Sequence, residues 1–155
     1  MNGNMLESVL MNDSERCAAR DAAFKAYEAK TLCNHRQKED GWSAAVATAS
    51  GSSMTAAEAH QLGLVAFKQK RLWAAEMFWT RSIALRSVGD GINPDTLKAR
   101  TNRAHVRTIL GRRIRSQALG NLVPATALLE GAVADAVAAI TIKPDWPVTT
   151  LSSTL

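Results

Sequence analysis

This chain of 155 residues has few aromatic side chains, two cysteines and four prolines. Cys17 and Cys33 form no C-x-x-C pair and no cluster with histidine, so the sequence predicts neither a disulfide framework nor a metal site. Aromatic residues make up only 5% of the chain, while alanine is its most frequent residue. Alanine favours closely packed helices, whereas sandwiches and barrels are richer in β-branched and aromatic residues. We therefore expect an all-α protein.

Targeting and membrane segments are also missing from the pattern. The opening residues MNGNMLESVL lack the basic segment followed by an apolar segment that marks a secretory signal. No window approaches the roughly 20 apolar residues that are needed to cross a bilayer. The sequence therefore predicts a cytoplasmic protein without a membrane partner.

Catalytic motifs are absent as well. No G-x-G-x-x-G or phosphate-binding loop occurs, and no Ser/His/Asp or Cys/His arrangement can be assembled. Carboxylates such as Glu58, Glu76 and Asp135 stand at helical spacings that are typical of exposed faces. The histidines are scattered as helix-face residues: His35, His60 and His105. We expect no enzymatic activity, no cofactor and no metal.

Acidic residues are missing from Thr96 to Leu129, although this stretch carries seven cations. The net charge of the chain is +5, and the whole positive excess comes from this stretch. The seven cations are Lys98, Arg100, Arg103, Arg107, Arg112, Arg113 and Arg115. An acidic partner is expected to bind here.

Helical periodicity divides the chain into segments. Thr55 and Glu58 form a capping box, which predicts that a helix begins at residue 55. The segment 39–54 is rich in Gly, Ser, Ala and Thr and is predicted to be a flexible linker, and Pro124 falls in an interruption at 114–126. The predicted helices cover 14–38, 55–69, 72–86, 95–112 and 127–141. The predicted units are a helical extension at 1–38, whose shallow apolar face suggests weak docking or exposure, then the linker, and a domain at 55–155.

Helix pair, loop and helix pair follow one another in residues 55–155, as in a repeat. Leu62, Gly63, Ala75 and Trp79 reproduce the L-G and A-x-x-x-F positions of the tetratricopeptide repeat. The segments GLVAFKQKRLWAAEMFWTRSIAL, TNRA and IKPDW resemble the tetratricopeptide domains of heat-shock co-chaperones. The resemblance implies a short α-solenoid in which Gly63 and Ala75 let two helices approach closely.

The solenoid would hold about two repeats and a truncated third repeat. The second repeat carries an insertion near 112–130, which is expected to form a basic loop or a helix extension. The third repeat stops at VTTLSSTL. Because solenoids usually need three or more repeats, the chain is marginally stable, is completed by a partner, or is capped by its own N-terminal helix.

The resemblance also implies a groove that binds a peptide, with the acidic C-terminal tail of a heat-shock chaperone as the leading partner. The clamp positions of that family fall on His60, Leu64, Asn102, Val148 and Ser152, and only Asn102 keeps the family's residue type. Independently, helical spacing places Lys98, Asn102, His105 and Ile109 on one narrow arc. The candidate peptide-binding residues are His60, Leu64, Lys98, Asn102 and His105.

Two other functions remain open at this stage. In the first, the chain would be a scaffold that self-associates through an exposed last helix. In the second, the basic ridge of the chain would bind nucleic acid. Nucleic-acid binding is the weaker of the two, since no aromatic residue interleaves with the arginines. The last helix would expose Leu128, Leu129, Val133, Val137 and Ile140. The basic ridge consists of Arg100, Arg103, Arg107, Arg112, Arg113 and Arg115.

Overall fold

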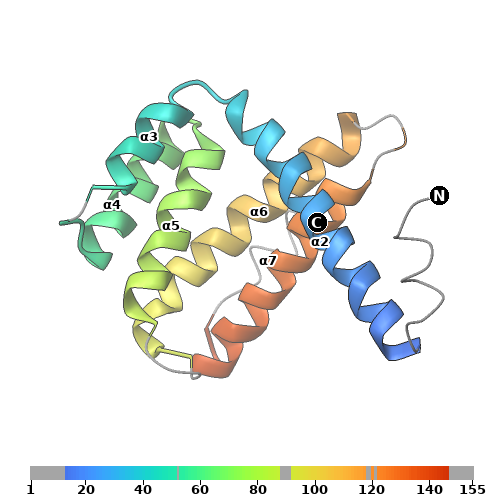
Figure 1. Ribbon diagram of the computed structural model, residues 1–155. Coiled ribbons are helices and arrows are strands. Elements are labelled where there is room, and N and C mark those ends of the chain that lie inside the picture. The colour runs from blue at the N-terminus through green and yellow to red at the C-terminus, as the bar shows by residue number, and fades with distance from the viewer. Residues whose placement is uncertain (1–12, 52, 88–91, 118–119, 121, 147–155) are drawn as a thin grey trace.

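The computed structural model describes residues 13–51, 53–87, 92–117, 120 and 122–146, and over these ranges it contains helices and no strands. This confirms the all-α prediction. The helices are α2 (Asp13–Gln37), α3 (Trp42–Ala49), α4 (Ala56–Lys68), α5 (Leu72–Arg86), α6 (Leu97–Gln117) and α7 (Val123–Ile142), with a short 3-10 helix η1 (Pro94–Thr96) before α6. Figure 1 shows α4, α5, α6 and α7 following one another in space, while α2 crosses over α6 and α7.

Helices α4 and α5 form the first hairpin, and both lie close to their predicted bounds. The helix start predicted at Thr55 is confirmed, since the Thr55 hydroxyl accepts the Glu58 backbone N–H at 3.1 Å and donates to the Glu58 carboxylate at 3.1 Å. The two helices approach closely at Gly63, where an added Cβ would lie 2.5 Å from Nε1 of Trp79. Trp79 is 2% exposed and donates its indole N–H to the carbonyl of His60 at 3.2 Å. The close approach predicted at Gly63 is therefore present, and an indole ring fills it.

Helices α6 and α7 form a second, longer hairpin. Their 21 and 20 residues exceed the 13 and 15 residues of α4 and α5. The predicted interruption at 114–126 is present but shorter, because α6 continues to Gln117 and α7 begins at Val123, with Pro124 in its first turn. Proline is tolerated there because the first N–H groups of a helix have no partner within the helix. The insertion near 112–130 is therefore taken up mainly as additional helix.

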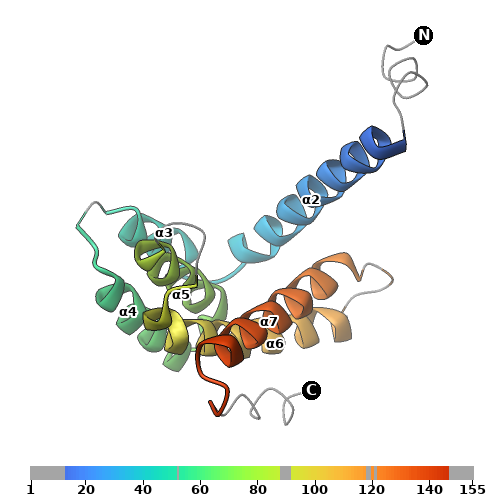
Figure 2. The same ribbon diagram turned by 90° about the horizontal axis from the view of Figure 1, so that it is seen from below.

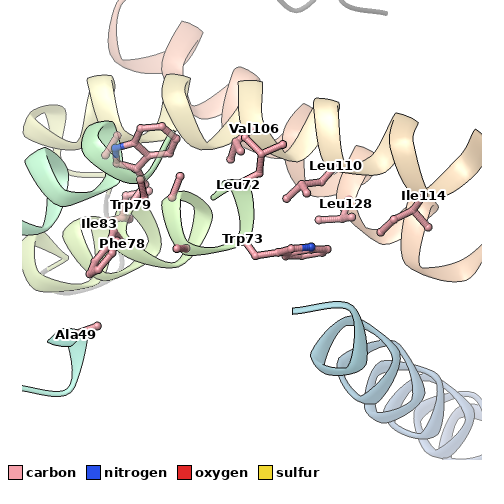
Figure 3. Close-up of a cluster of buried hydrophobic side chains, with 14 of the residues drawn as sticks. Ala49, Leu72, Trp73, Phe78, Trp79, Ile83, Val106, Leu110, Ile114 and Leu128 are labelled. Carbon is pink, nitrogen blue, oxygen red and sulfur yellow. The ribbon is translucent and has the colours of Figure 1, made fainter. Parts of the chain in front are cut away.

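The second hairpin packs through small residues. Ala104 and Ala132 form a buried cluster of their own, and a Cβ at Gly111 would meet Leu129 at 2.9 Å. The main core lies between the two hairpins, where Trp73 and Leu72 of α5 face Leu110 of α6 and Leu128 of α7 (Figure 3). Leu128 is 3% exposed, so the prediction that it belongs to an exposed face is wrong.

The predicted flexible linker contains a packed helix. Within 39–54, residues Trp42 to Ala49 form α3, which contacts α5, and Ala49 is buried in the main core. The linker prediction is wrong at these residues because a Ser- and Ala-rich segment is helical when a neighbouring core covers one side of it, here at Ala45 and Ala49. Gly41 precedes α3 with φ 78°, a left-handed conformation that favours glycine.

Helix α2 projects from the body of the molecule and contacts it through α3 and α7 (Figure 2). Most of its described side chains from Lys25 to Gln37 are exposed or half-buried, and Leu32 packs against the main core. This agrees with the expectation of a weakly docked helix.

The C-terminal end of α2 and the residues after it dock on the start of α5. Glu39 accepts the backbone N–H groups of Trp73 and Ala74, each at 2.8 Å, although it lies more than 30 residues earlier in the chain. His35 stacks on the indole of Trp73 at 6.5 Å, and the guanidinium of Arg36 lies 5.5 Å from the centre of that ring. Residues 35–39 therefore cap α5, which has no side-chain cap at its own first residue.

Helix α7 is long and apolar enough to cross a membrane, judged by its length and composition alone. This corrects the prediction that no window of the sequence approaches a spanning segment. Only one side of the helix is buried in the fold, since Leu128 and Ala132 face the interior while Val133 and Val137 are 62% and 57% exposed.

Candidate functional site

The structure brings the predicted peptide-binding residues onto one face between α4 and α6. His60 and Leu64 lie one turn apart on α4, and Lys98, Asn102 and His105 follow one another on α6. The two helices meet through Phe67 of α4, whose ring centre lies 5.8 Å from that of His105. We call the surface formed by His60, Leu64, Lys98, Asn102 and His105 the α4–α6 face. Val148 and Ser152, the remaining clamp positions, lie outside the described residues.

The residues of the α4–α6 face differ in what they offer a ligand. Lys98 is exposed, while His60 and Asn102 are half-buried. Leu64 is half-buried too and packs against the main core, as Ile109 of α6 does, and we call these two partly exposed apolar side chains the apolar floor. The Asn102 amide makes no hydrogen bond with another residue of the described part of the chain, so its donor and acceptor are open to a peptide backbone.

Two histidines on the face have lowered pKa values. Burial lowers the pKa of His60, and the nearby positive charges of Arg86 and Lys98 lower it further. Burial also lowers the pKa of His105. Both imidazoles are therefore neutral at pH 7. The buried Nδ1 of His105 has no hydrogen-bond partner among the described residues.

The predicted basic ridge is not a single solvated surface. Arg103 makes a bidentate pair with Asp135 of α7 at 2.8 and 2.6 Å, and its third nitrogen donates to the Thr80 hydroxyl at 3.2 Å. Arg107 donates to Glu76 of α5 at 2.9 and 3.1 Å and to Asp135 at 3.2 Å. The prediction of an exposed ridge is therefore wrong for these two arginines, because their charges are neutralised between three helices.

The carboxylates of this cluster are buried. Glu76 is 4% and Asp135 is 2% exposed, which contradicts the prediction that they lie on exposed faces. Two further arginines approach the same carboxylates: Arg100 lies 3.8 Å from Asp135, and Arg36 of α2 lies 3.9 Å from Glu76. We call this group of four arginines, Glu76 and Asp135 the arginine–carboxylate cluster. Burial lowers the pKa of Arg100, and the charge of Asp135 opposes that shift.

The rest of the predicted ridge lies at the far end of α6. Arg113 and Arg115 are exposed and Arg112 is half-buried. The predicted ridge thus consists of two groups. Arg100, Arg103 and Arg107 make ion pairs with α5 or α7, whereas Arg112, Arg113 and Arg115 lie beyond them near the end of α6. Sequence spacing places these arginines on α6 but gives no information about carboxylates on α5 and α7.

Two structural residues were missed by sequence reasoning. Glu39 was assigned to a linker, and no local pattern relates it to the start of α5. Trp146 follows α7 and donates its indole N–H to the Thr101 hydroxyl of α6 at 2.9 Å, with Lys143 lying 5.4 Å from its ring. Trp146 belongs to the IKPDW segment that resembles the tetratricopeptide domains, but that resemblance did not predict its contact. The structure shows that Trp146 attaches the end of α7 to α6.

Among the residues that the structure describes, no group of three or more His, Cys, Asp or Glu side chains is arranged to hold a metal ion. The α4–α6 face offers a cation, an amide and two partly exposed apolar side chains. This arrangement suits binding of a polar, anionic chain. No family model, no curated protein and no solved structure matches this chain.

Proposed function

We propose that this chain is a protein-interaction module that binds an extended acidic peptide on the α4–α6 face. The proposal rests on three features of α4 and α6: the exposed cation of Lys98, the Asn102 amide without a hydrogen-bond partner among the described residues, and the partly exposed apolar side chains of Leu64 and Ile109. A cation beside an amide can bind a carboxylate and a peptide backbone group at the same time. The apolar floor can bind a side chain of the same peptide.

The architecture supports a tetratricopeptide-like arrangement for this module. Two helix hairpins lie next to each other, and α5 of the first contacts α6 of the second. Gly63 and Trp79 occupy the close approach that the resemblance implies. In this proposal α4 and α6 are the helices that line the binding face.

An acidic ligand is favoured over nucleic acid. Arg86 and Lys98 lie close enough to His60 for their positive charges to lower its pKa, so the field at this end of the face is positive. Arg103 and Arg107, which a nucleic-acid interface would need, already donate to buried carboxylates. Withdrawing them would remove the hydrogen-bonded partners of both buried carboxylates and leave only the longer ion pairs with Arg100 and Arg36, which is costly.

The resemblance proposes the C-terminal tail of a heat-shock chaperone as the first ligand to test. Such a tail ends in Glu-Glu-Val-Asp, which offers several carboxylates and one apolar side chain. Because Lys98 is exposed, its ion pair is expected to contribute only about 0.2–1 kcal/mol. A neutral hydrogen bond from Asn102 would contribute about 0.5–1.5 kcal/mol. Binding is therefore expected to be weak.

Fluorescence anisotropy with a labelled Glu-Glu-Val-Asp peptide tests the proposal. The Lys98→Ala variant should weaken binding about twofold to fivefold, and Asn102→Ala by about threefold to tenfold. Lys38→Ala is the matched control, because Lys38 is an exposed lysine between α2 and α3, outside the face. Equal losses in all three variants would indicate non-specific attraction. Absence of binding by the folded protein would refute the chaperone tail as ligand.

A second titration tests whether the acidic charge of the peptide or its particular sequence is recognised. A peptide in which the acidic residues are replaced by their amides keeps the backbone and the apolar side chain. If the acidic peptide binds and this amide peptide does not, charge carries the recognition. If an acidic peptide of different sequence binds equally well and is also weakened by Asn102→Ala, the face binds acidic peptides in general.

A further inference from the structure

The outer face of α7 presents an uncovered apolar stripe with a regular spacing. Val133, Val137 and Ile140 are 62%, 57% and 42% exposed, even though α2 contacts the same helix. We call the following residues the α7 stripe: Thr126, Leu129, Glu130, Val133, Val137 and Ile140. Thr126, Val133 and Ile140 stand seven residues apart, as do Glu130 and Val137. A seven-residue repeat is the spacing of a coiled-coil seam.

The stripe also contains a hollow of the kind that receives a side chain from another helix. A shallow depression of about 330 Å³ is lined by Thr126, Leu129, Glu130 and Val133. These positions are i, i+3, i+4 and i+7, the four residues that form a hole in knobs-into-holes packing. The hollow therefore fits one side chain projecting from a partner helix.

Charges at the two ends of the stripe indicate the partner and its direction. Glu130 is exposed near one end, and Lys143 is exposed just after the other end of the helix. In a parallel pair of copies, Glu130 would face Glu130 of the other copy. In an antiparallel pair, Lys143 of one copy comes within about one helical turn of Glu130 of the other.

We propose that the α7 stripe pairs with the α7 stripe of a second copy of this chain in antiparallel orientation, with Ile140 of each copy in the hollow of the other. In this register Val133 lies opposite Val137 of the other copy, and Glu130 lies level with Ile140. The stripe is then self-complementary in shape and in charge. This pairing is independent of peptide binding, because α4 takes no part in it.

The buried face of α7 favours a second copy over a lipid bilayer. Asp135 lies on that face and makes a bidentate pair with Arg103 of α6. Inserting α7 into a bilayer would break this pair and expose both charges to hydrocarbon. Pairing through the stripe leaves the cluster intact.

The dimer is expected to be weak. Twenty residues of helix are about 30 Å long and a helix is about 10 Å wide, so one seam covers on the order of 300 Å² on each copy. This is smaller than the roughly 800 Å² per partner of a typical stable interface. The interface therefore belongs to the weak, transient class, and the fraction of dimer should rise as the full chain is concentrated, over a measured range of about 1 to 300 µM.

Sedimentation velocity over this concentration range tests the proposal with a matched pair of variants. Val133→Glu should weaken dimerisation at least tenfold, while Val65→Glu should leave it unchanged, because Val65 is 49% exposed on α4. Circular dichroism confirms that each variant is folded. A wild-type chain that stays monomeric throughout, or a dimer that both variants keep, would refute the proposal. Flotation of a monomeric wild-type chain with lipid vesicles would show that the stripe binds membranes instead.

Cysteine crosslinking tests the direction of pairing. In a background with Cys17→Ser and Cys33→Ser, a mixture of Glu130→Cys and Ile140→Cys chains should form a disulfide between the two variants under mild oxidation. Each variant alone should crosslink poorly, since its own cysteines would lie about 15 Å apart along the seam. Efficient crosslinking of Ile140→Cys with itself would show a parallel pair and would refute the proposed register.

Discussion

Replacement of Asp135 by asparagine tests whether the arginine–carboxylate cluster stabilises the fold. Asp135 accepts two hydrogen bonds from Arg103 and one from Arg107, and its side chain is 3% exposed. Breaking a buried ion pair by removing one partner costs about 3–5 kcal/mol. Asparagine keeps one acceptor oxygen, so the lower end of this range is expected. At about 2–4 °C per kcal/mol for a chain of this size, the melting temperature should fall by roughly 6–12 °C.

Urea unfolding followed by circular dichroism and tryptophan fluorescence measures this effect. Asp40→Asn is the matched control, because Asp40 is exposed, and it should change the unfolding free energy by no more than about 0.5 kcal/mol. A double-mutant cycle with Arg103→Gln should give a coupling of at least about 1 kcal/mol. Equal unfolding free energies for Asp135→Asn and Asp40→Asn would refute the reasoning, because they would show that Asp135 behaves as a solvent-exposed carboxylate.

Three further outcomes follow from contacts described above. Glu39→Ala should destabilise the fold by about 1–2 kcal/mol in urea unfolding, because the amides at the start of α5 lose their acceptor. Gly63→Ala should destabilise it by about 1–3 kcal/mol despite the helix propensity of alanine, since the new Cβ meets the Trp79 indole; thermal melting that matches wild type would contradict this. Burial lowers the folded-state pKa of His60 and His105. Their contribution to the free energy of unfolding should therefore be fully present above about pH 6.5 and should decline as pH falls below it. Unfolding between pH 7.5 and 5.5 measures this slope, which glutamine at both histidines should reduce.

Local sequence signals predicted the bounds of α4 and α5. The capping box at Thr55 and Glu58 marked the start of α4, and the apolar spacing from Leu72 gave α5 its bounds. Pro124 misled the prediction for α7, because proline marks a break inside a helix but is also common in the first turn. The hydroxyl- and alanine-rich segment before residue 55 gave no apolar periodicity, so α3 was assigned to a linker.

Pairings between distant elements could not be predicted in the same way. Helical spacing placed Lys98, Asn102 and His105 on one arc, and the structure keeps them there. The same spacing said nothing about which helix would face Arg103, so its bidentate pair with Asp135 was missed. A charge on a helix is solvated or neutralised according to what packs against it, and this depends on tertiary structure.

The contacts of residues 35–39 determine where this chain can be divided. A fragment that starts at residue 55 keeps both helix hairpins but removes the acceptor of two α5 amides and uncovers the ring of Trp73. The repeat pattern and the cooperative folding unit therefore have different N-terminal limits. A shortened version that retains these contacts must begin upstream of His35, and a transfer of the two hairpins into another chain would have to carry this segment along with them.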